Sequence, residues 1–199
     1  KENGLPENSF VFGCLNNNYK ITPDIFSSWM EVLKKTKDSV LWLLIDEVFA
    51  KRNIEKEANK LGINSNRIIY ASRVPSKTHL ERLKCIDLFL DTFPYNAHTT
   101  AKEAIRVGVP IITIIGNSFA SRVASSILAS VGLEELITRN VKEYTKLAIN
   151  LRNDNSKLEK IKIYLSQPKI IAKIHDCKKF TRDLEEIYIE MIKRVYSWS

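Results

Sequence analysis

Short, wholly apolar stretches alternate with longer amphipathic stretches along most of this chain, and this alternation restricts the possible folds more than any other feature. The run at residues 39–45 (SVLWLLI) has almost no polar face, which indicates a strand buried on both sides. Residues 23–35 instead repeat apolar side chains at helical spacing, which is typical of a helix with one buried face. Strands of this kind separated by such helices predict a parallel sheet with helices on both faces.

The same pattern divides the chain into predicted elements. The predicted strands are residues 9–14, 39–45, 67–70, 86–90 and 109–115. The predicted helices are residues 23–35, 53–61, 76–85, 99–107, 118–131, 140–151, 155–167 and 179–196. We therefore expect the α/β class, a Rossmann-like doubly wound parallel sheet with helices on both faces plus C-terminal helices. Residues 1–199 are expected to form a single domain, with the final helices, about 140–199, packed as a tail.

Composition narrows the class of protein without choosing a function. The 199 residues carry a formal net charge of +8, which favours an anionic partner such as a phosphate, a nucleotide, a nucleic acid or a membrane surface. The lysines are scattered along amphipathic segments, so a solvated basic surface explains the same charge. The cysteines, Cys14, Cys85 and Cys177, lack the spacing of a metal site, so we expect no metal and a reducing, cytoplasmic environment.

Several other classes are disfavoured by what the sequence lacks. No apolar run is long enough to span a membrane, and the N-terminus has no apolar signal-peptide core. Because the sequence does not begin with Met, we expect a fragment of a longer protein. No Gly-rich phosphate motif of the dinucleotide or NTPase kind is present. Aromatic and basic residues do not alternate as in RNA-binding domains, so no nucleic-acid partner is expected.

The most distinctive polar segment, residues 91–100 (DTFPYNAHTT), follows a predicted strand and opens a predicted helix. Ligands of parallel α/β sheets bind beyond the carboxyl ends of the strands, so this segment lies where a site is expected. Thr99 and Thr100 would offer hydroxyl and backbone N–H groups to an anion at a helix N-terminus. Glu103, one turn further, would reach a ribose hydroxyl. The plainer alternative is a threonine that caps the helix together with this acid.

Three other loops at the same predicted edge carry polar groups. Residues 15–20 (LNNNYK) offer amides and the ammonium of Lys20 to a phosphate, or form only an Asn-rich turn. His79 and Arg82 lie one turn apart on a predicted helix and would hold a base or a phosphate, unless the histidine is merely solvated. Residues 116–122 (GNSFASR) form another strand–turn–helix junction, whose arginine would close the phosphate site or pair with a nearby acid.

Taken in order, these segments resemble the C-terminal catalytic domain of the O-linked N-acetylglucosamine (O-GlcNAc) transferase family, which includes the SPINDLY-like proteins, and its bacterial members most of all. The segment at residues 93–100 (FPYNAHTT) is similar to the family's most characteristic loop, and a helix follows it that ends at residues 108–110 (GVP). Further similar segments are residues 17–23, 39–44, 66–69, 119–124 and 180–188. The resemblance covers nearly the whole chain.

The resemblance implies a fold and a reaction. The fold would be the C-terminal, nucleotide-sugar-binding lobe of a two-lobed GT-B glycosyltransferase. The reaction would be an inverting, metal-independent transfer of N-acetylglucosamine from UDP-GlcNAc to a Ser or Thr hydroxyl of an acceptor protein, with the UDP-sugar as substrate and no cofactor. The partners would be the N-terminal catalytic lobe and tetratricopeptide repeats of the full-length chain, so the isolated fragment is expected to be inactive.

The resemblance also assigns roles to individual residues. Lys20 matches the family's pyrophosphate lysine and is the expected catalytic residue, while Asn17 stands where a Gln contacts the nucleotide. The expected phosphate-cradling residues are His98, Thr99 and Thr100, and those around the uracil and ribose are Val74, His79, Arg82 and Glu103. Three positions depart from the family pattern: Glu103 replaces an Asp, Ser76 a Lys (with Lys77 displaced by one position), and Asn117 an acidic residue.

These departures leave alternatives open. One is a protein glycosyltransferase of the same fold that uses GDP-fucose or UDP-glucose, for which the base pocket around Val74, His79 and Arg82 would decide. Another is a non-catalytic module that binds a partner protein or an anionic glycan, which Ser76, Asn117 and the basic charge would fit.

Overall fold

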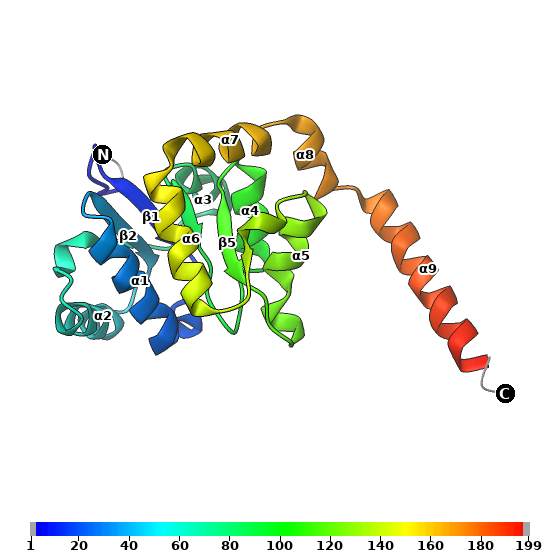
Figure 1. Cartoon of the computed structure of the whole chain (residues 1–199), viewed down its shortest axis with the longest axis horizontal. Coiled ribbons are helices and arrows are strands. Elements are labelled where there is room, and N and C mark those ends of the chain that lie inside the picture. Colours follow the sequence, from blue (N-terminus) through cyan, green and yellow to red (C-terminus); the bar gives the residue numbers. More distant parts are fainter. Residues whose placement is uncertain (1–2, 197–199) are drawn as a thin grey trace.

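The computed structural model describes residues 3–196, and its centre is one parallel sheet of six strands (Figure 1). The strands are β1 (Phe10–Cys14), β2 (Ser39–Leu44), β3 (Ile68–Ala71), β4 (Leu88–Leu90), β5 (Ile111–Ile114) and β6 (Ile137–Thr138). They lie in the order β3-β2-β1-β4-β5-β6, and every neighbouring pair is parallel. This order is the doubly wound arrangement, in which the chain moves outward from β1 in both directions. The predicted α/β class is confirmed.

Helices cover both faces of the sheet. They are α1 (Pro23–Lys35), α2 (Val48–Lys60), α3 (Ser76–Leu83), α4 (Thr99–Arg106), α5 (Val123–Ser130), α6 (Val141–Asn153), α7 (Asn155–Leu165), α8 (Pro168–Lys173) and α9 (Cys177–Tyr196). Figure 1 shows α1 and α6 side by side over one face, and α3 and α4 behind the sheet. Apolar side chains of the strands and of both helical layers form one continuous core, in which Trp29, Trp42 and Tyr144 are the largest fully buried side chains.

The structure differs from the predicted elements most clearly at β6, α8, α2 and the predicted helix 118–131. Strand β6 was not predicted, because two residues are too few to show a periodic pattern. Helix α8 was not predicted either; it begins at Pro168, directly after the predicted helix 155–167. Helix α2 begins at Val48 rather than at residue 53. The predicted helix 118–131 is divided into a short 3-10 turn (Phe119–Ser121) with its own capping box and the helix α5.

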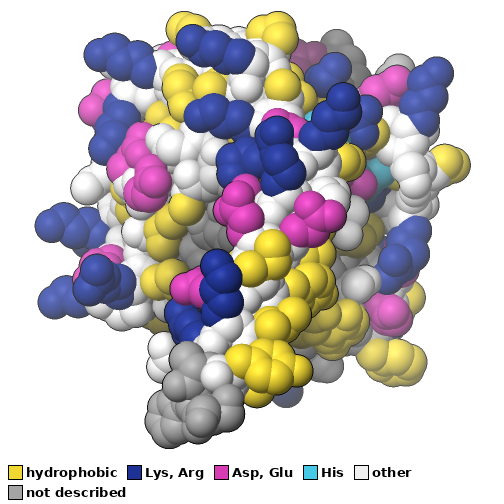
Figure 2. All heavy atoms as spheres, turned by 90° about the vertical axis from the view of Figure 1, so that its right-hand side faces the viewer, with side chains coloured by type: hydrophobic (Ala, Val, Ile, Leu, Met, Phe, Trp, Pro, Cys, Tyr) yellow, Lys and Arg dark blue, Asp and Glu magenta, His cyan; other side chains and the backbone are white. Residues whose placement is uncertain are grey.

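The stretch that we expected to pack as a tail, about residues 140–199, is divided in two by the structure. Helix α6 belongs to the core, since Tyr144, Ala148 and Leu151 are fully buried. Helix α9, in contrast, has no buried residue and extends away from the domain (Figure 1). Figure 2 shows hydrophobic side chains gathered along this helix, and the exposed ones are Phe180, Ile187, Tyr188, Ile189, Met191, Ile192, Val195 and Tyr196. Among residues 3–196, no helix is both long and apolar enough to cross a membrane.

Candidate functional site

The loops that follow the strands meet at one edge of the sheet, as the parallel arrangement requires. Lys20, after β1, donates from Nζ to the backbone oxygen of Asn96, after β4, at 2.9 Å. Arg73, after β3, donates to Oδ1 of Asn17 at 2.7 Å. The backbone N–H of Asn96 donates to the oxygen of Ala120, after β5, at 3.0 Å. The predicted site segments are therefore neighbours in space, although they are far apart in the sequence.

A buried carboxylate shapes the loop between β4 and α4. Asp91 Oδ1 accepts hydrogen bonds from the backbone N–H groups of Thr92 (2.8 Å) and Ala97 (2.6 Å) and from the Asn16 amide (3.2 Å). Its Oδ2 accepts from the Thr113 hydroxyl at 2.7 Å. Burial raises the pKa of Asp91 to about 6, and the four hydrogen bonds oppose this rise by favouring the ionised form. The Asp91 side chain is thus hydrogen-bonded to the segment after β1, to β5 and to both ends of the loop.

Lys20 is held at the entrance of this loop. Besides its hydrogen bond to the Asn96 oxygen, its ammonium lies 3.8 Å from the centre of the Tyr95 ring. Burial lowers the pKa of Lys20, while the negative charge of Asp91 raises it again. An ammonium has three N–H donors, and one of them is used by the Asn96 oxygen. The remaining donors are available to a phosphate that approaches the edge of the sheet.

The N-terminus of α4 is open to an anion. His98 occupies the N-cap position and makes no capping hydrogen bond with its side chain. The first hydrogen bond that enters the helix runs from the Lys102 N–H to the His98 oxygen at 3.2 Å, so the N–H groups of Thr99 and Thr100 have no helical acceptor. The alternative of a threonine cap paired with Glu103 is wrong, because His98 is the N-cap and the position of the pairing acid falls on Ala101.

His98 itself is fixed by ring contacts. Its ring centre lies 5.2 Å from that of Tyr95 and 5.9 Å from that of Phe119. Its Nε2 lies 3.4 Å from the backbone oxygen of Ala120, which links the α4 N-terminus to the turn after β5. His98, Thr99, Thr100 and Lys20 are therefore arranged around the same loop.

The predicted base and ribose residues form a second cluster. Arg82 donates to Nδ1 of His79 from two nitrogens, at 3.3 Å and 3.0 Å, and also to the backbone oxygen of Ser72. His79 Nε2 lies 3.6 Å from Glu103 Oε2. Burial, and then the charge of Arg82, lower the pKa of His79. The lowered pKa favours the neutral ring, and because Arg82 donates to Nδ1, the proton of that neutral ring lies on Nε2, the nitrogen that faces Glu103.

Val74 is half-buried in the extended segment between β3 and α3. Pro75, the N-cap of α3, separates it from Ser76, the first residue of that helix. Burial raises the pKa of Glu103, which lies on α4 and so brings the two clusters together. A carboxylate and a neutral imidazole side by side supply an acceptor and a donor for the hydroxyl and carbonyl groups of a nucleoside.

Two contributors to the site were not singled out from the sequence. Arg73 binds Asn17 and also pairs with Asp46 at 3.4 Å, which joins the loops after β1, β2 and β3. Tyr95 supplies the ring beneath Lys20. Both residues follow predicted strands, so their position was a usable signal, but their partners are distant in the sequence and no local pattern reveals them.

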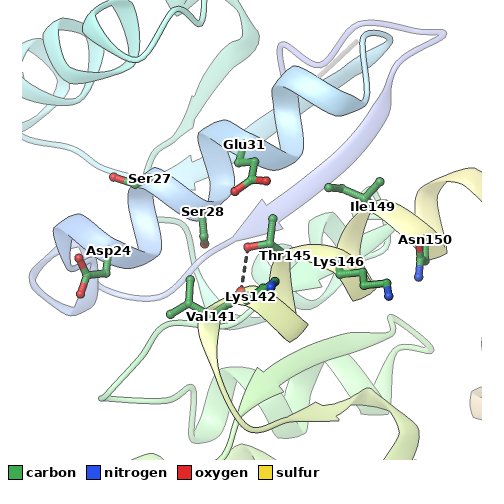
Figure 3. Close-up of a pocket in the computed structure, with 10 residues that line it drawn as sticks. All are labelled: Asp24, Ser27, Ser28, Glu31, Val141, Lys142, Thr145, Lys146, Ile149 and Asn150. Atoms are coloured by element: carbon green, nitrogen blue, oxygen red, sulfur yellow. Dashed lines mark hydrogen bonds between the residues drawn. The ribbon is translucent and has the colours of Figure 1, made fainter.

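Two cavities of the described surface lie away from this edge of the sheet. A cavity of about 700 Å³ runs between α1 and α6, where Asp24 and Glu31 stand on one wall and Lys142 and Lys146 on the other (Figure 3). A second cavity, of about 950 Å³, lies between α4, α5 and the start of α9. No predicted site residue lines either cavity.

Comparison with known proteins agrees with this geometry. Residues 1–184 match the family described as glycosyl transferase family 41. The UDP-N-acetylglucosamine–peptide N-acetylglucosaminyltransferase of Caenorhabditis elegans is 31% identical over 193 residues, which are 97% of this chain and 17% of that protein. A probable enzyme of the same description, SPINDLY of Solanum lycopersicum, is 33% identical over 94% of this chain and 21% of its own length.

Among solved structures, a mutant of the Thermobaculum terrenum O-GlcNAc transferase superposes with a TM-score of 0.85. The two sequences are 29% identical, and the match covers 94% of this chain and 37% of that one. The chain thus spans about a fifth of the length of the curated relatives and over a third of the solved one. A fold with these strands, and a family match over nearly all of its length, lead to one conclusion: the chain belongs to glycosyl transferase family 41 and has the fold of the C-terminal lobe of a GT-B glycosyltransferase.

Proposed function

We propose that this chain is the nucleotide-sugar-binding lobe of a protein O-glycosyltransferase, which moves N-acetylglucosamine from UDP-GlcNAc to Ser or Thr hydroxyls of proteins. One observation supports the proposal most strongly: Lys20 binds the backbone oxygen of Asn96, two residues before His98, the N-cap of α4. A cation and a row of free N–H groups on one edge suit a pyrophosphate. The names of the relatives from C. elegans and tomato supply the sugar and the acceptor class.

The chemistry follows from where charge develops during transfer. When the sugar leaves UDP with inversion at its anomeric carbon, negative charge grows on the β-phosphate. Lys20 and the N–H groups of Thr99 and Thr100 would stabilise that charge, a task that a metal ion performs in other glycosyltransferases. Preorganised donors of this kind contribute on the order of 2–4 kcal/mol each to the transition state. The neutral His79 and the Glu103 carboxylate would orient the nucleoside.

The rest of the full-length protein would complete the enzyme. Because the chain spans about a fifth of its curated relatives, we propose that an N-terminal catalytic lobe, which is expected to come with tetratricopeptide repeats, supplies the facing wall of the cleft and the acceptor site. Alone, the chain should bind the nucleotide weakly and turn over little or no sugar.

Isothermal titration of UDP and GDP into the purified chain tests the proposal. We expect saturable UDP binding, and Lys20→Ala should weaken it by about 1.5–3 kcal/mol, the contribution of a charge-assisted hydrogen bond. Lys35→Ala is the matched control, since this exposed lysine ends the same helix, α1, that begins just after Lys20. The control should bind UDP like the unmodified chain.

Each other outcome points to a different function. A preference for GDP would favour a fucosyltransferase of the same fold, with Ser76 in place of the family's lysine as the first residue to examine. Saturable binding that Lys20→Ala leaves unchanged would remove the pyrophosphate role of this lysine. No binding of either nucleotide, even with the N-terminal lobe added, would contradict the proposal and favour a non-catalytic module.

A further inference from the structure

The carboxylate of Asp91 is the point at which the parts of the nucleotide edge are joined. Oδ1 receives the Asn16 amide from the end of β1 and the N–H groups at both ends of the loop, Thr92 and Ala97. Oδ2 receives the Thr113 hydroxyl from β5. The side chain is 1% exposed, so a nucleotide would not touch it. Any influence of Asp91 on ligand binding must therefore act through the groups that it holds.

Those groups are the ones that would meet the phosphates. Ala97, whose N–H is held at 2.6 Å, immediately precedes His98, the N-cap of α4. Asn96, whose backbone oxygen accepts from Lys20, lies between the anchored Thr92 and the anchored Ala97. The position of one carboxylate consequently fixes the start of α4 and the acceptor of Lys20 together.

The charge of Asp91 has a second effect, on Lys20. Burial disfavours the ammonium and lowers its pKa, and Asp91 counteracts this by raising it. The other titratable groups that face Asp91 are Cys14 on β1 and Tyr144 on α6, and burial raises the pKa of both, so they remain neutral. Between them, Lys20 and Asp91 form a pair of opposite charges around a loop that contains the predicted phosphate site.

An asparagine would serve a purely structural purpose at this position. It has nearly the same shape, its amide oxygen can accept the three bonds now made to Oδ1, and its amide nitrogen can donate to the Thr113 hydroxyl. It also avoids the burial of a charge, which is costly in a protein interior. Among these properties, only the negative charge distinguishes the carboxylate from an asparagine of the same shape.

We propose that Asp91 is the positioning residue of the nucleotide site: its carboxylate holds the 91–98 segment so that Lys20 and the N-terminus of α4 meet one pyrophosphate. This inference rests on the proposed nucleotide-sugar function and adds to it a residue that does not touch the substrate. The side chain has two effects that can be separated. Its oxygens hold the loop through hydrogen bonds, and its negative charge favours the ammonium form of Lys20.

The test is titration of UDP-GlcNAc into the unmodified chain and into Asp91→Asn, Asp91→Ala and Thr113→Val, from about pH 5 to pH 10. UDP-GlcNAc is chosen because both of its phosphates are esterified and stay ionised over this range, and its uracil titrates equally with every variant. Circular dichroism of each variant shows whether it is folded. Asp91→Asn keeps the test decisive if Asp91→Ala does not fold.

We expect the unmodified chain and Asp91→Asn to bind alike near neutral pH, because the asparagine oxygen keeps the acceptor position. At high pH, Asp91→Asn should lose binding at a lower pH than the unmodified chain does, since Lys20 has lost the charge that favours its ammonium. Asp91→Ala should bind at least about tenfold more weakly at every pH, because the loop loses its anchor. Thr113→Val should weaken binding less than Asp91→Ala does, since it removes only one of the four hydrogen bonds that hold the carboxylate.

The possible failures are separable. If the unmodified chain binds UDP-GlcNAc and Asp91→Asn shows the same pH profile, the inference is overturned and the nucleotide site stands. Full affinity in a folded Asp91→Ala variant would also overturn it. If the unmodified chain shows no binding at any pH, the proposed function fails, and this inference fails with it.

Discussion

Asn16, Asp91 and Thr113 are almost completely buried, although they lie directly beneath the residues that would meet a nucleotide. The surface residues Lys20, His98 and Thr99 could be predicted from the sequence, because a strand end followed by a helix start marks the position of a ligand. The buried residues beneath them could not. Their role depends on hydrogen bonds between positions that are distant in the chain, such as Asn16 and Asp91, and no local pattern records such pairs.

At this scale the pH dependence of stability is a measurable consequence. Asp91 has an ordinary pKa of 3.8 and, when buried in the folded chain, a pKa of about 6. Between these values the folded state binds the proton more tightly than the unfolded state. The stabilisation from the protonated form is therefore complete below about pH 4 and is lost as the pH rises through 6, a change of up to about 3 kcal/mol in the free energy of unfolding.

Urea denaturation of the chain and of Asp91→Asn, at several pH values between about 4 and 8, measures this pH dependence of the free energy of unfolding. Other carboxyl groups contribute to both proteins and cancel in the difference. The difference in unfolding free energy should change with pH in this window, in favour of Asp91→Asn as the pH rises. Parallel curves would show that Asp91 is ionised throughout and that burial does not raise its pKa.

Helices α1 and α6 are joined to the site strand by a chain of hydrogen bonds. Trp29 Nε1, on α1, donates to the Tyr144 hydroxyl of α6 at 3.1 Å, and that hydroxyl donates to the backbone oxygen of Asp91 at 2.9 Å. The apolar spacing of α1 was enough to predict its bounds, residues 23–35, without error. The spacing says only which face is buried, however, so it does not reveal that α6 would be the neighbour or that a hydroxyl would link the two.

Tyr144→Phe tests this link between elements. The change removes one hydroxyl and leaves two buried groups, the Trp29 N–H and the Asp91 oxygen, without their partner. We expect a loss of about 1–3 kcal/mol in the free energy of unfolding, measured with urea.

Tyr164→Phe is the control for this prediction. Its hydroxyl donates to the Val131 oxygen at 2.7 Å in a half-buried position, where water can replace the lost group. Its loss should therefore cost less. Equal losses in the two variants would mean that the buried hydrogen bonds of Tyr144 stabilise the fold no more than the half-buried one of Tyr164.

In the whole molecule, α9 is the element that does not join the core. Its apolar side chains form one stripe and are exposed, among them Ile187, Met191 and Val195. The amphipathic spacing predicted a helix here, and the helix is confirmed. The same spacing implied a packed face, which the domain does not provide. The periodicity of a sequence shows which face of a helix is apolar, but it does not show which element packs against that face.

Removal of residues 177–199 tests how independent the core is. No α9 side chain is buried, so we expect the free energy of unfolding in urea to change by less than about 0.5 kcal/mol. The exposed stripe should also make the intact chain self-associate, so sedimentation should show less association after truncation. Met191→Lys in the intact chain should reduce association in the same direction. A clear loss of stability on truncation would mean that α9 packs against the domain in solution.

The strand order also governs how the chain is assembled as it is made. Phe12, in β1, pairs with Leu41 on one side and with Leu88 on the other. A nascent chain can build β1, β2 and β3 once residue 71 has left the ribosome, but the far edge of β1 stays unpaired until β4 follows. At about 5–20 residues per second this interval lasts roughly 1–4 s. During it, the unpaired edge of this buried strand can pair with wrong partners. Because β1 lies in the centre of the sheet, this is the stage of synthesis at which a chaperone would be most useful, by shielding the unpaired edge of β1.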